Sequence, residues 1–537
     1  TIPQILVKQV QEMRKIPSYR QAKGLLTTTE KVGQLFMPAA FINDSEAEIA
    51  QLEQLIGRHH VGGLCFFHSR ASAATNYEGK KKVVYNEKSF ETLRSLVERY
   101  QKAATHPLLI AIDAEWGLAM RVENTPQYPY AITLGAMQDG DDLIFEMGRN
   151  IAKDCLAAGI HWNLAPVVDI NVNPNNPVIG YRSFGEDKTS VTRKALAYIK
   201  GMEREGLLTS IKHFPGHGDT ETDSHLGLPL IDKTKEALQE NELFPFQELV
   251  NHGVDSVMVG HLSVPSLAGG KPVPSSISKE IIKGVLRKEM GFKGVVISDA
   301  LNMHAVSKNH PKKGELEWLA FDAGNDVLCF AEHTKEAIET IVQKASEQQI
   351  EESFQKVWQL KEKAVDARSS EKTIVQQGTL SDPNLLNKKM ARMSLTLFKG
   401  DEDAIAYFRK KAFIKRSIPQ TANSRFFTDI EHGPQLEKAM ETEQNILLAL
   451  FPRQVKPAND FGYSKKELQS INTLLKANQV ILYLFGNPYV LGLLDISKAR
   501  AVVVAYQDFE VFQKEAAAHF LGTFKADGKL PITLPKP

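Results

Sequence analysis

The sequence predicts an α/β fold class: an N-terminal (β/α)8 TIM-type barrel followed by a C-terminal α/β domain built as an α/β/α sandwich. Eight short apolar runs rich in β-forming residues occur between residues 31 and 330, and longer helical patterns separate them. Buried parallel strands that alternate with helices are typical of such a barrel. A polar break over residues 366–384 and four further apolar runs indicate the second domain.

The expected barrel elements follow the chain in order. The strands are predicted at residues 31–39, 61–67, 108–113, 159–170, 207–214, 254–262, 294–301 and 326–330. The helical patterns between them include residues 142–159 and 278–292, whereas the polar residues 69–88 are expected to form a long surface loop. A doubly wound sheet fits this alternation less well, because no G-x-G-x-x-G sequence follows the first strand.

The domain boundaries follow from the same pattern. We expect a catalytic barrel domain over residues 1–365, a linker rich in Ser, Thr and Gln over 366–384, and the sandwich domain over 385–537. Strands of the second domain are predicted at residues 394–400, 445–451, 479–488 and 499–506. Nothing in this domain carries evident chemistry, so an interaction module is an alternative role for it.

The composition excludes several classes of protein. The 537 residues carry a net charge of +1, which argues against a nucleic-acid or anionic-membrane partner, and no apolar run has the length of a membrane span. Cys65, Cys155 and Cys329 lie far apart and are expected to be core residues. The chain begins at Thr1, so we expect an exported bacterial protein, periplasmic or of the cell envelope, whose signal peptide has been removed. A cytoplasmic location and the oligomeric state are left open.

Polar residues follow five of the predicted barrel strands. They are Asp113 and Glu115, Asp169, Lys212 and His213, His261, and Asp299. A single acid after a strand is often only the cap of the next helix. Because the active sites of (β/α)8 barrels form where their strands end, five polar ends on one rim indicate a shared site. In that site, Asp299 is a candidate carboxylate nucleophile.

The stretch KHFPGHGDTETDSH, residues 212–225, allows three interpretations. His213, His217 and Asp219 are possible metal ligands, although the interruption by Pro215, Gly216 and Gly218 is unlike a helical zinc motif. The glycines also permit a phosphate-binding turn. The third interpretation is an acid/base pair, in which the Asp223 carboxylate fixes the tautomer of His225 and raises its basicity.

This stretch, followed by LGLPLI, resembles the signature of glycoside hydrolase family 3. It is most similar to the β-N-acetylhexosaminidase (β-N-acetylglucosaminidase) branch, which has an Asp-x-His acid/base pair on this loop. The pieces IDAEWGLAMRV, NPVIGYRSFGED and ISDALNM agree in order and spacing. The resemblance covers the whole barrel, and it extends more loosely to FGNPY and GKLPITL in the second domain.

The resemblance implies roles for particular residues. Asp299 is the nucleophile, His225 is the general acid/base, and Asp223 orients His225. A further set binds the sugar hydroxyls or the N-acetyl group: Asp113, Arg121, Arg182, Lys212 and His213. A rim of structural salt bridges is the alternative for that set. His217 is expected to shape the loop, while Asp169 and His261 remain candidates without a role.

The implied reaction is the retaining release of terminal β-linked N-acetylglucosamine, from peptidoglycan-derived or chitin-like oligosaccharides. A glycan that ends in this sugar is thus the expected partner, and no cofactor or metal is expected. A β-glucosidase of the same family, a phosphorolytic variant and a non-catalytic sugar-binding barrel are the alternatives. Trp116, Leu118, Ala119 and Tyr181 depart from the common family pattern, which affects the expected leaving-group preference more than the reaction.

Overall fold

The computed structural model describes residues 16–73, 83–223, 227–368, 379–431 and 444–535. The chain forms two compact units, each described by itself below. The first comprises residues 1–127, 145–169 and 195–381, and the second comprises 128–144, 170–194 and 382–537. The chain enters the second unit for the last time inside the predicted linker, of which residues 369–378 lie outside the described part.

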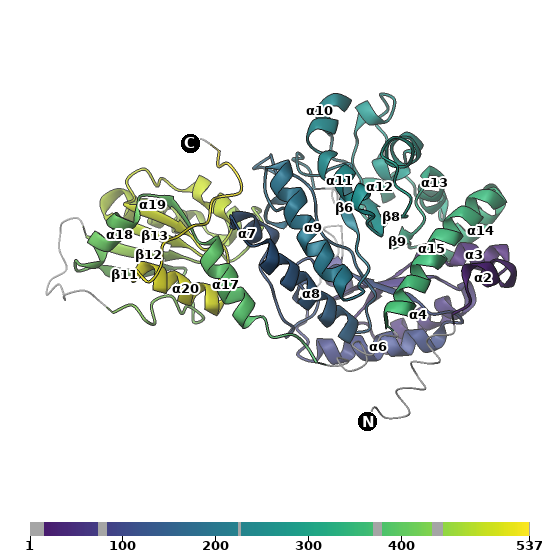
Figure 1. Ribbon diagram of the computed structural model, residues 1–537, viewed down its shortest axis with the longest axis horizontal. Coiled ribbons are helices and arrows are strands. Elements are labelled where there is room, and N and C mark those ends of the chain that lie inside the picture. Colours follow the sequence, from purple (N-terminus) through teal and green to yellow (C-terminus); the bar gives the residue numbers. More distant parts are fainter. Residues whose placement is uncertain (1–15, 74–82, 224–226, 369–378, 432–443, 536–537) are drawn as a thin grey trace. The chain divides into compact units, whose positions relative to one another are not determined.

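The first unit is a closed barrel of parallel strands, and the predicted barrel is confirmed (Figure 1). Its strands are β1 (Phe36–Met37), β2 (Ala39–Phe41), β3 (Gly63–Phe67), β4 (Leu109–Ile112), β5 (Trp162–Asn163), β6 (Ile211–Phe214), β7 (Ser256–Val259), β8 (Val295–Ser298) and β9 (Leu328–Cys329). Parallel pairing joins β2-β3-β4-β5, β6-β7-β8 and β1-β9. Bridges between Trp162 and Leu208 and between Ile297 and Val327 connect these groups, so the barrel closes.

Side-chain hydrogen bonds cap the start of some helices of this unit. The helices of this unit include α2 (Tyr19–Leu25), α3 (Thr28–Gly33), α4 (Glu46–His59), α6 (Ser89–Ala103), α8 (Asp141–Ala157), α9 (Lys188–Arg204), α10 (Lys235–Glu240), α11 (Phe244–His252), the π-helix η6 (Glu280–Glu289), α13 (Glu315–Ala323), α14 (Thr334–Lys344) and α15 (Glu347–Arg368). The first residues of α8 and of α9 belong to the second unit. Ser45 and Glu48 form a capping box that starts α4. Within the described residues, no helix has the length and apolarity needed to span a bilayer.

The first predicted strand was placed too early. Residues 31–33 lie in α3, and the strand itself spans residues 36–41 with a break at Pro38. The capping box of Thr27 and Glu30 starts a helix at this point and overrides the apolar pattern. In the predicted loop 69–88, residues 70–73 form the short helix α5 (Arg70–Ala73), and residues 74–82 lie outside the described part.

The second unit contains a five-stranded sheet in the order β10-β14-β13-β12-β11. Its strands are β10 (Thr396–Lys399), β11 (Ile414–Ile418), β12 (Asn445–Leu450), β13 (Gln479–Leu484) and β14 (Ala501–Val504), and only the pairing of β10 is antiparallel. The sequence predicted four of these strands and missed β11. All residues of Ile414–Ile418 are half-buried or exposed, as suits an edge strand, and three consecutive polar residues leave no continuous apolar run to mark it.

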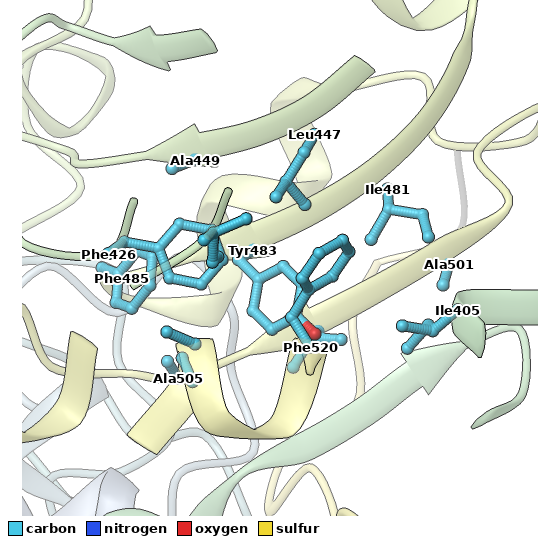
Figure 2. Close-up of a cluster of buried hydrophobic side chains, with 14 of the residues drawn as sticks. Ile405, Phe426, Leu447, Ala449, Ile481, Tyr483, Phe485, Ala501, Ala505 and Phe520 are labelled. Carbon is cyan, nitrogen blue, oxygen red and sulfur yellow. The ribbon is translucent and has the colours of Figure 1, made fainter. Parts of the chain in front are cut away.

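Both faces of the three central strands are buried, as expected for an α/β/α sandwich. Helices α17 (Asn384–Ser394), α18 (Glu402–Arg409), α19 (Lys465–Ala477) and α20 (Glu510–Phe520) accompany the sheet. On one face, Tyr483, Phe485 and Phe426 pack with Phe520 of α20 (Figure 2). Alternating residues of β12 and β13 therefore point to one or the other of two apolar layers.

Two segments that the sequence assigns to the barrel domain belong to the second unit. Residues 128–144 contribute Thr133, whose hydroxyl donates to Gln507 Oε1 at 2.6 Å. Residues 170–194 contribute Asn171, whose amide donates to the hydroxyl of Tyr489 at 2.8 Å. A pattern read along the chain assigns segments by their order, whereas these side chains find partners several hundred residues away.

Candidate active site

The predicted rim residues lie where the barrel strands end. Asp113 directly follows β4, and Asp299 directly follows β8. Lys212 and His213 lie within the last three residues of β6, and Asp169 comes soon after the bridge between Val167 and Lys212. Because the strands are parallel, their carboxyl ends meet at one face of the barrel.

An ion-pair cluster surrounds Asp113. Lys212 Nζ lies 3.0 Å from one Asp113 oxygen, and Arg121 Nη2 lies 3.0 Å from the other. Lys212 is 1% exposed, and its Nζ is also 3.6 Å from Glu115 Oε1. Burial alone raises the pKa of Asp113, but the charges of Lys212 and Arg121 lower it well below its usual range. Asp113 therefore stays ionised near neutral pH, with two basic side chains and the Glu115 carboxyl group in the same cluster.

Arg121 retains a donor for an additional acceptor. Besides its contact with Asp113, the guanidinium of Arg121 lies 5.5 Å from the centre of the Phe67 ring. Its Nε atom is buried and has no hydrogen-bond partner among the described residues. A buried donor without a partner costs stability, so this group favours a ligand oxygen that accepts from it.

Asp169 organises the start of the 212–225 stretch. One of its oxygens lies 2.8 Å from His213 Nδ1, and the other accepts from the backbone N–H groups of His213 and His217 at 3.1 and 2.8 Å. Burial raises the pKa of Asp169, but the electrostatic interaction with His213 and these hydrogen bonds outweigh burial and lower it. The sequence left Asp169 without a role, whereas the structure makes it the residue that orients His213.

His217 is buried, and its pKa is lowered to about 4 by burial first and by the neighbouring His213 second. Its Nδ1 lies 2.8 Å from the Thr220 hydroxyl. The imidazole is therefore neutral near pH 7 and fixed within its own loop, in agreement with the predicted shaping role. The Asp299 carboxylate also acts on this pKa, so Asp299 lies close to the Asp169–His213–His217 group.

Asp299 occupies a fixed position at the end of β8. Its backbone N–H donates to Val259 O at 2.9 Å, which continues the pairing of β8 with β7. One carboxylate oxygen accepts from the N–H of Ala300 at 2.8 Å. His261 holds the next peptide, because its ring nitrogens lie 2.9 Å from Ala300 O and 2.7 Å from the Ser276 hydroxyl. His261 is fully buried.

The predicted acid/base loop is described in part. Asp223 is half-buried, and its carbonyl accepts from Gly227 N at 2.9 Å, whereas His225 lies outside the described residues. Arg182 is a half-buried residue of the 3₁₀ turn η3 (Gly180–Arg182) and belongs to the second unit. The structure thus brings Asp113, Arg121, Lys212, His213 and Asp299 to the barrel rim.

The sequence analysis missed a histidine on this rim. His68 directly follows β3, and its Nε2 contacts the Glu123 carboxylate closely. Glu123 also accepts from Asn86 N at 3.2 Å, so it ties the chain after Arg121 to the segment before α6. The strand-end rule that found the other rim residues would have found His68, had it been applied to the strand at 61–67.

A metal site finds no support in the described geometry. No group of three or more His, Cys, Asp or Glu side chains there could hold an ion. The Nδ1 atoms of His213 and His217 are engaged with Asp169 and Thr220. Asp219, the third residue of the metal interpretation, is instead paired with Lys233 at 2.8 Å.

The comparison with known families decides the assignment. The sequence profile described as "Glycosyl hydrolase family 3 N terminal domain" matches residues 27–360. The chain belongs to glycosyl hydrolase family 3. The matched residues contain every barrel strand and all the rim residues described above.

Two curated relatives are β-hexosaminidases. The chain is 32% identical to β-hexosaminidase A of Pseudoalteromonas piscicida over 389 residues, which cover 65% of this chain and 61% of that protein. It is 35% identical to the β-hexosaminidase of Tolumonas auensis over 287 residues, which cover 52% of this chain and 79% of that protein. The match therefore spans less than two thirds of the first relative and about four fifths of the second.

Solved structures agree with this assignment. A family 3 β-N-acetylglucosaminidase from Paenibacillus sp. superposes with a TM-score of 0.75 at 26% identity, covering 95% of this chain and 99% of that one. A β-glucoside phosphorylase superposes with a TM-score of 0.79 at 20% identity, covering 98% of this chain and 96% of that one. At this identity the likeness shows a shared fold alone. The resemblance to the β-N-acetylhexosaminidase branch is confirmed, and the protein is a glycoside hydrolase.

Proposed function

We propose that this protein is a retaining exo-β-N-acetylglucosaminidase. The observation that carries the proposal is the position of Asp299, a carboxylate at the end of β8 beside a rim of paired sugar-binding groups. The names of the relatives support the same activity. The substrate class we propose is a glycan that ends in β-linked N-acetylglucosamine, derived from peptidoglycan or chitin-like chains.

In the first proposed step, Asp299 attacks the anomeric carbon and a covalent glycosyl-Asp299 intermediate forms. Protonated His225 transfers its proton to the leaving oxygen as the glycosidic bond breaks. In the second step, His225 removes a proton from water, which then attacks the anomeric carbon and releases the sugar from Asp299. Asp223 orients His225 in both steps.

The rim cluster holds the sugar during both steps. Arg121 Nε and Lys212 offer donors for hydroxyl or N-acetyl oxygens, and Asp113 keeps both cations in place. Asp169 occupies His213 Nδ1, so we propose that the opposite ring nitrogen, Nε2, contacts the sugar. We propose Arg182 as a further sugar ligand on the basis of the sequence motif alone.

A histidine acid/base has one physical consequence. A neutral imidazole repels an anionic acceptor less than a carboxylate does, so phosphate can replace water in the second step. Phosphorolysis is therefore the second candidate function. An exported location in a bacterium remains our proposal from the sequence.

Substrate comparison tests the activity directly. We expect the purified protein to release p-nitrophenol from the β-N-acetylglucosaminide and far less from the β-glucoside. With phosphate present, a rate that rises with phosphate and a sugar 1-phosphate product identify phosphorolysis. A preference for the glucoside would contradict the proposal, and binding of N-acetylglucosamine without turnover would favour a sugar-binding barrel.

The acid/base pair has its own signature. Asp223→Ala and His225→Ala are each expected to lower kcat, and the double variant should be little worse than the worse single variant, because the two residues act as one unit. Activated aryl glycosides need little protonation, so their first step should be affected less, and a burst should appear as the intermediate accumulates. Additive losses without a burst would place the acid/base elsewhere.

A further inference from the structure

An ion-pair cluster lies at the base of the loop that follows β6. Lys233 Nζ is 2.8 Å from an Asp219 oxygen and 2.7 Å from Glu242 Oε1. Asp219 lies near the start of this loop and Lys233 lies beyond its end, so their contact ties the two ends together. We name the three residues Asp219, Lys233 and Glu242 the clasp.

The clasp is anchored to the body of the barrel through Glu242. This residue lies in the turn between α10 and α11, and its side chain is 2% exposed. Its Oε1 also accepts from the amide of Asn241 at 3.3 Å. Burial lowers the pKa of Lys233, but the hydrogen bonds to Asp219 and Glu242 reverse this and raise it. A buried carboxylate and a permanently charged lysine therefore hold Asp219 from one side.

The close approach of the loop to Glu242 depends on Gly216. A Cβ atom at this position would lie 3.1 Å from Glu242 Cβ, and the φ angle of +131° also favours glycine. This contact sets the distance between the start of the loop and the turn that carries Glu242. Packing and ion pairing thus act on the same few residues.

Hydrogen bonds fix the chain on both sides of the clasp. On one side, Asp169 accepts from His217 N at 2.8 Å. On the other side, Ser263 accepts from Ile231 N at 2.9 Å and donates through its own N–H to Pro229 O at 2.8 Å. Between these anchors, residues 219–223 form no strand or helix, and the clasp holds Asp219, four positions before Asp223.

We infer that Asp219, Lys233 and Glu242 are positioning residues that hold Asp223 and its loop in the place required for acid/base catalysis. This inference rests on the proposed function. It makes the clasp a determinant of how well the enzyme protonates a poor leaving group, with no contact to the substrate itself. Removal of the Lys233 charge leaves two carboxylates that repel each other across the base of the loop.

Lys233→Met tests the clasp, because it keeps the side-chain length and removes the charge. General acid/base catalysis is worth about 10²–10⁴-fold, so a displaced loop should cost about tenfold in kcat/KM with chitobiose. With p-nitrophenyl β-N-acetylglucosaminide, kcat/KM should fall by no more than about twofold, because its leaving group needs little protonation. Lys233→Arg can keep both ion pairs and should restore most of the loss.

Lys235→Met is the matched control. Lys235 lies two residues further along the chain and pairs with Glu289 at 2.8 Å on the surface. This variant should have the wild-type kcat/KM with both substrates. If Lys233→Met folds poorly, as thermal unfolding will show, Glu242→Gln keeps the buried acceptor, removes its charge and should show the same substrate-dependent loss.

The result that overturns the clasp is an equal loss with both substrates, or no loss relative to Lys235→Met, while Asp223→Ala still shows leaving-group dependence. In that case the cluster only stabilises the fold. A wild-type protein that hydrolyses neither substrate would instead overturn the proposed function, and the clasp with it. A cycle with Asp219→Asn adds a check, because the double variant with Lys233→Met should lose no more than Lys233→Met alone.

Discussion

The residues that directly follow the parallel strands differ between the two units. In the barrel, Asp113 and Asp299 directly follow β4 and β8. In the second unit, Phe451 and Phe485 directly follow β12 and β13, and their rings stack with centroids 4.9 Å apart. Both units bring strand ends to one edge of a sheet, yet one edge is charged and the other is apolar. The residues placed there, and not the α/β architecture, therefore decide where chemistry occurs.

The difference also separates activity from stability. Each charged group on the barrel rim needs a partner, and Lys212 finds one in Asp113 despite its burial. The aromatic residues of the second unit contribute through the apolar area that they bury. Substitutions on the rim should therefore change turnover most, and substitutions in the aromatic core should change the free energy of unfolding most.

The largest effect is expected at Asp299. Asp299→Asn is nearly isosteric but removes the attacking charge, so kcat should fall by at least about a thousandfold, which corresponds to several kcal/mol of barrier. Asp322→Asn, at a half-buried carboxylate 2.8 Å from Lys279, is the control and should keep full activity. A variant at Asp299 that folds and retains more than about a tenth of the wild-type kcat would show that another residue attacks.

The second unit should respond in the opposite way. Phe426 is fully buried against Tyr483 and Phe485, so Phe426→Ala should lower the free energy of unfolding by about 3–5 kcal/mol. Below its unfolding temperature, kcat should stay within about twofold of wild type. Phe398→Ala, on edge strand β10 with 38% of the residue exposed, should cost less than about 1 kcal/mol in the same denaturant titration. A large loss of kcat in the folded Phe426 variant would contradict this separation of activity from stability.

The buried histidine of the rim should make the barrel sensitive to acid. His217 has a pKa of about 4 in the folded protein and about 6.5 when unfolded, so the unfolded chain binds more protons between these values. The stability from neutral His217 is complete above pH 6.5 and is lost as the pH falls toward 4. At pH 5 the loss amounts to about 2 kcal/mol. The free energy of unfolding should therefore fall less between pH 7 and pH 5 in His217→Gln than in the wild-type protein. An equal fall in both proteins would contradict the assignment of this pH dependence to His217.

The smallest effect is expected from chelation. Prolonged EDTA treatment should leave activity unchanged, because His213 is assigned to sugar contact and His217 to loop shape. A parallel sample dialysed without EDTA is the control. Activity that is lost and then restored by a single divalent metal would revive the metal interpretation.

The barrel could be predicted because each of its strands is marked by a local pattern of apolar residues. Short apolar runs alternate with helical patterns, and this periodicity survives without any knowledge of contacts. The misplaced start at residues 31–33 and the missed strand β11 both lie where local sequence is ambiguous. A capping box outweighed an apolar run in the first case, and edge exposure removed the apolar signal in the second.

The candidate site could be predicted only in part. Strand-end position pointed to Asp113, Lys212, His213 and Asp299, and the family resemblance pointed to Arg121. The pairing of Asp169 with His213 and of Lys233 with Glu242 left no comparable signal, because each depends on the three-dimensional path of the chain between the two residues. His68 was within reach of the same rule and was overlooked.

The sequence by itself determined the order of strands and helices and the charges at the strand ends, since both depend on neighbours along the chain. Only the tertiary structure decided which charges meet. Asp113 and Lys212 are 99 positions apart, and Asp169 and His213 are 44 positions apart, yet each pair makes contact within 3.0 Å. The physical reason is that closure of the barrel brings together strand ends that the chain keeps far apart, and burial then requires that every charge there finds a partner.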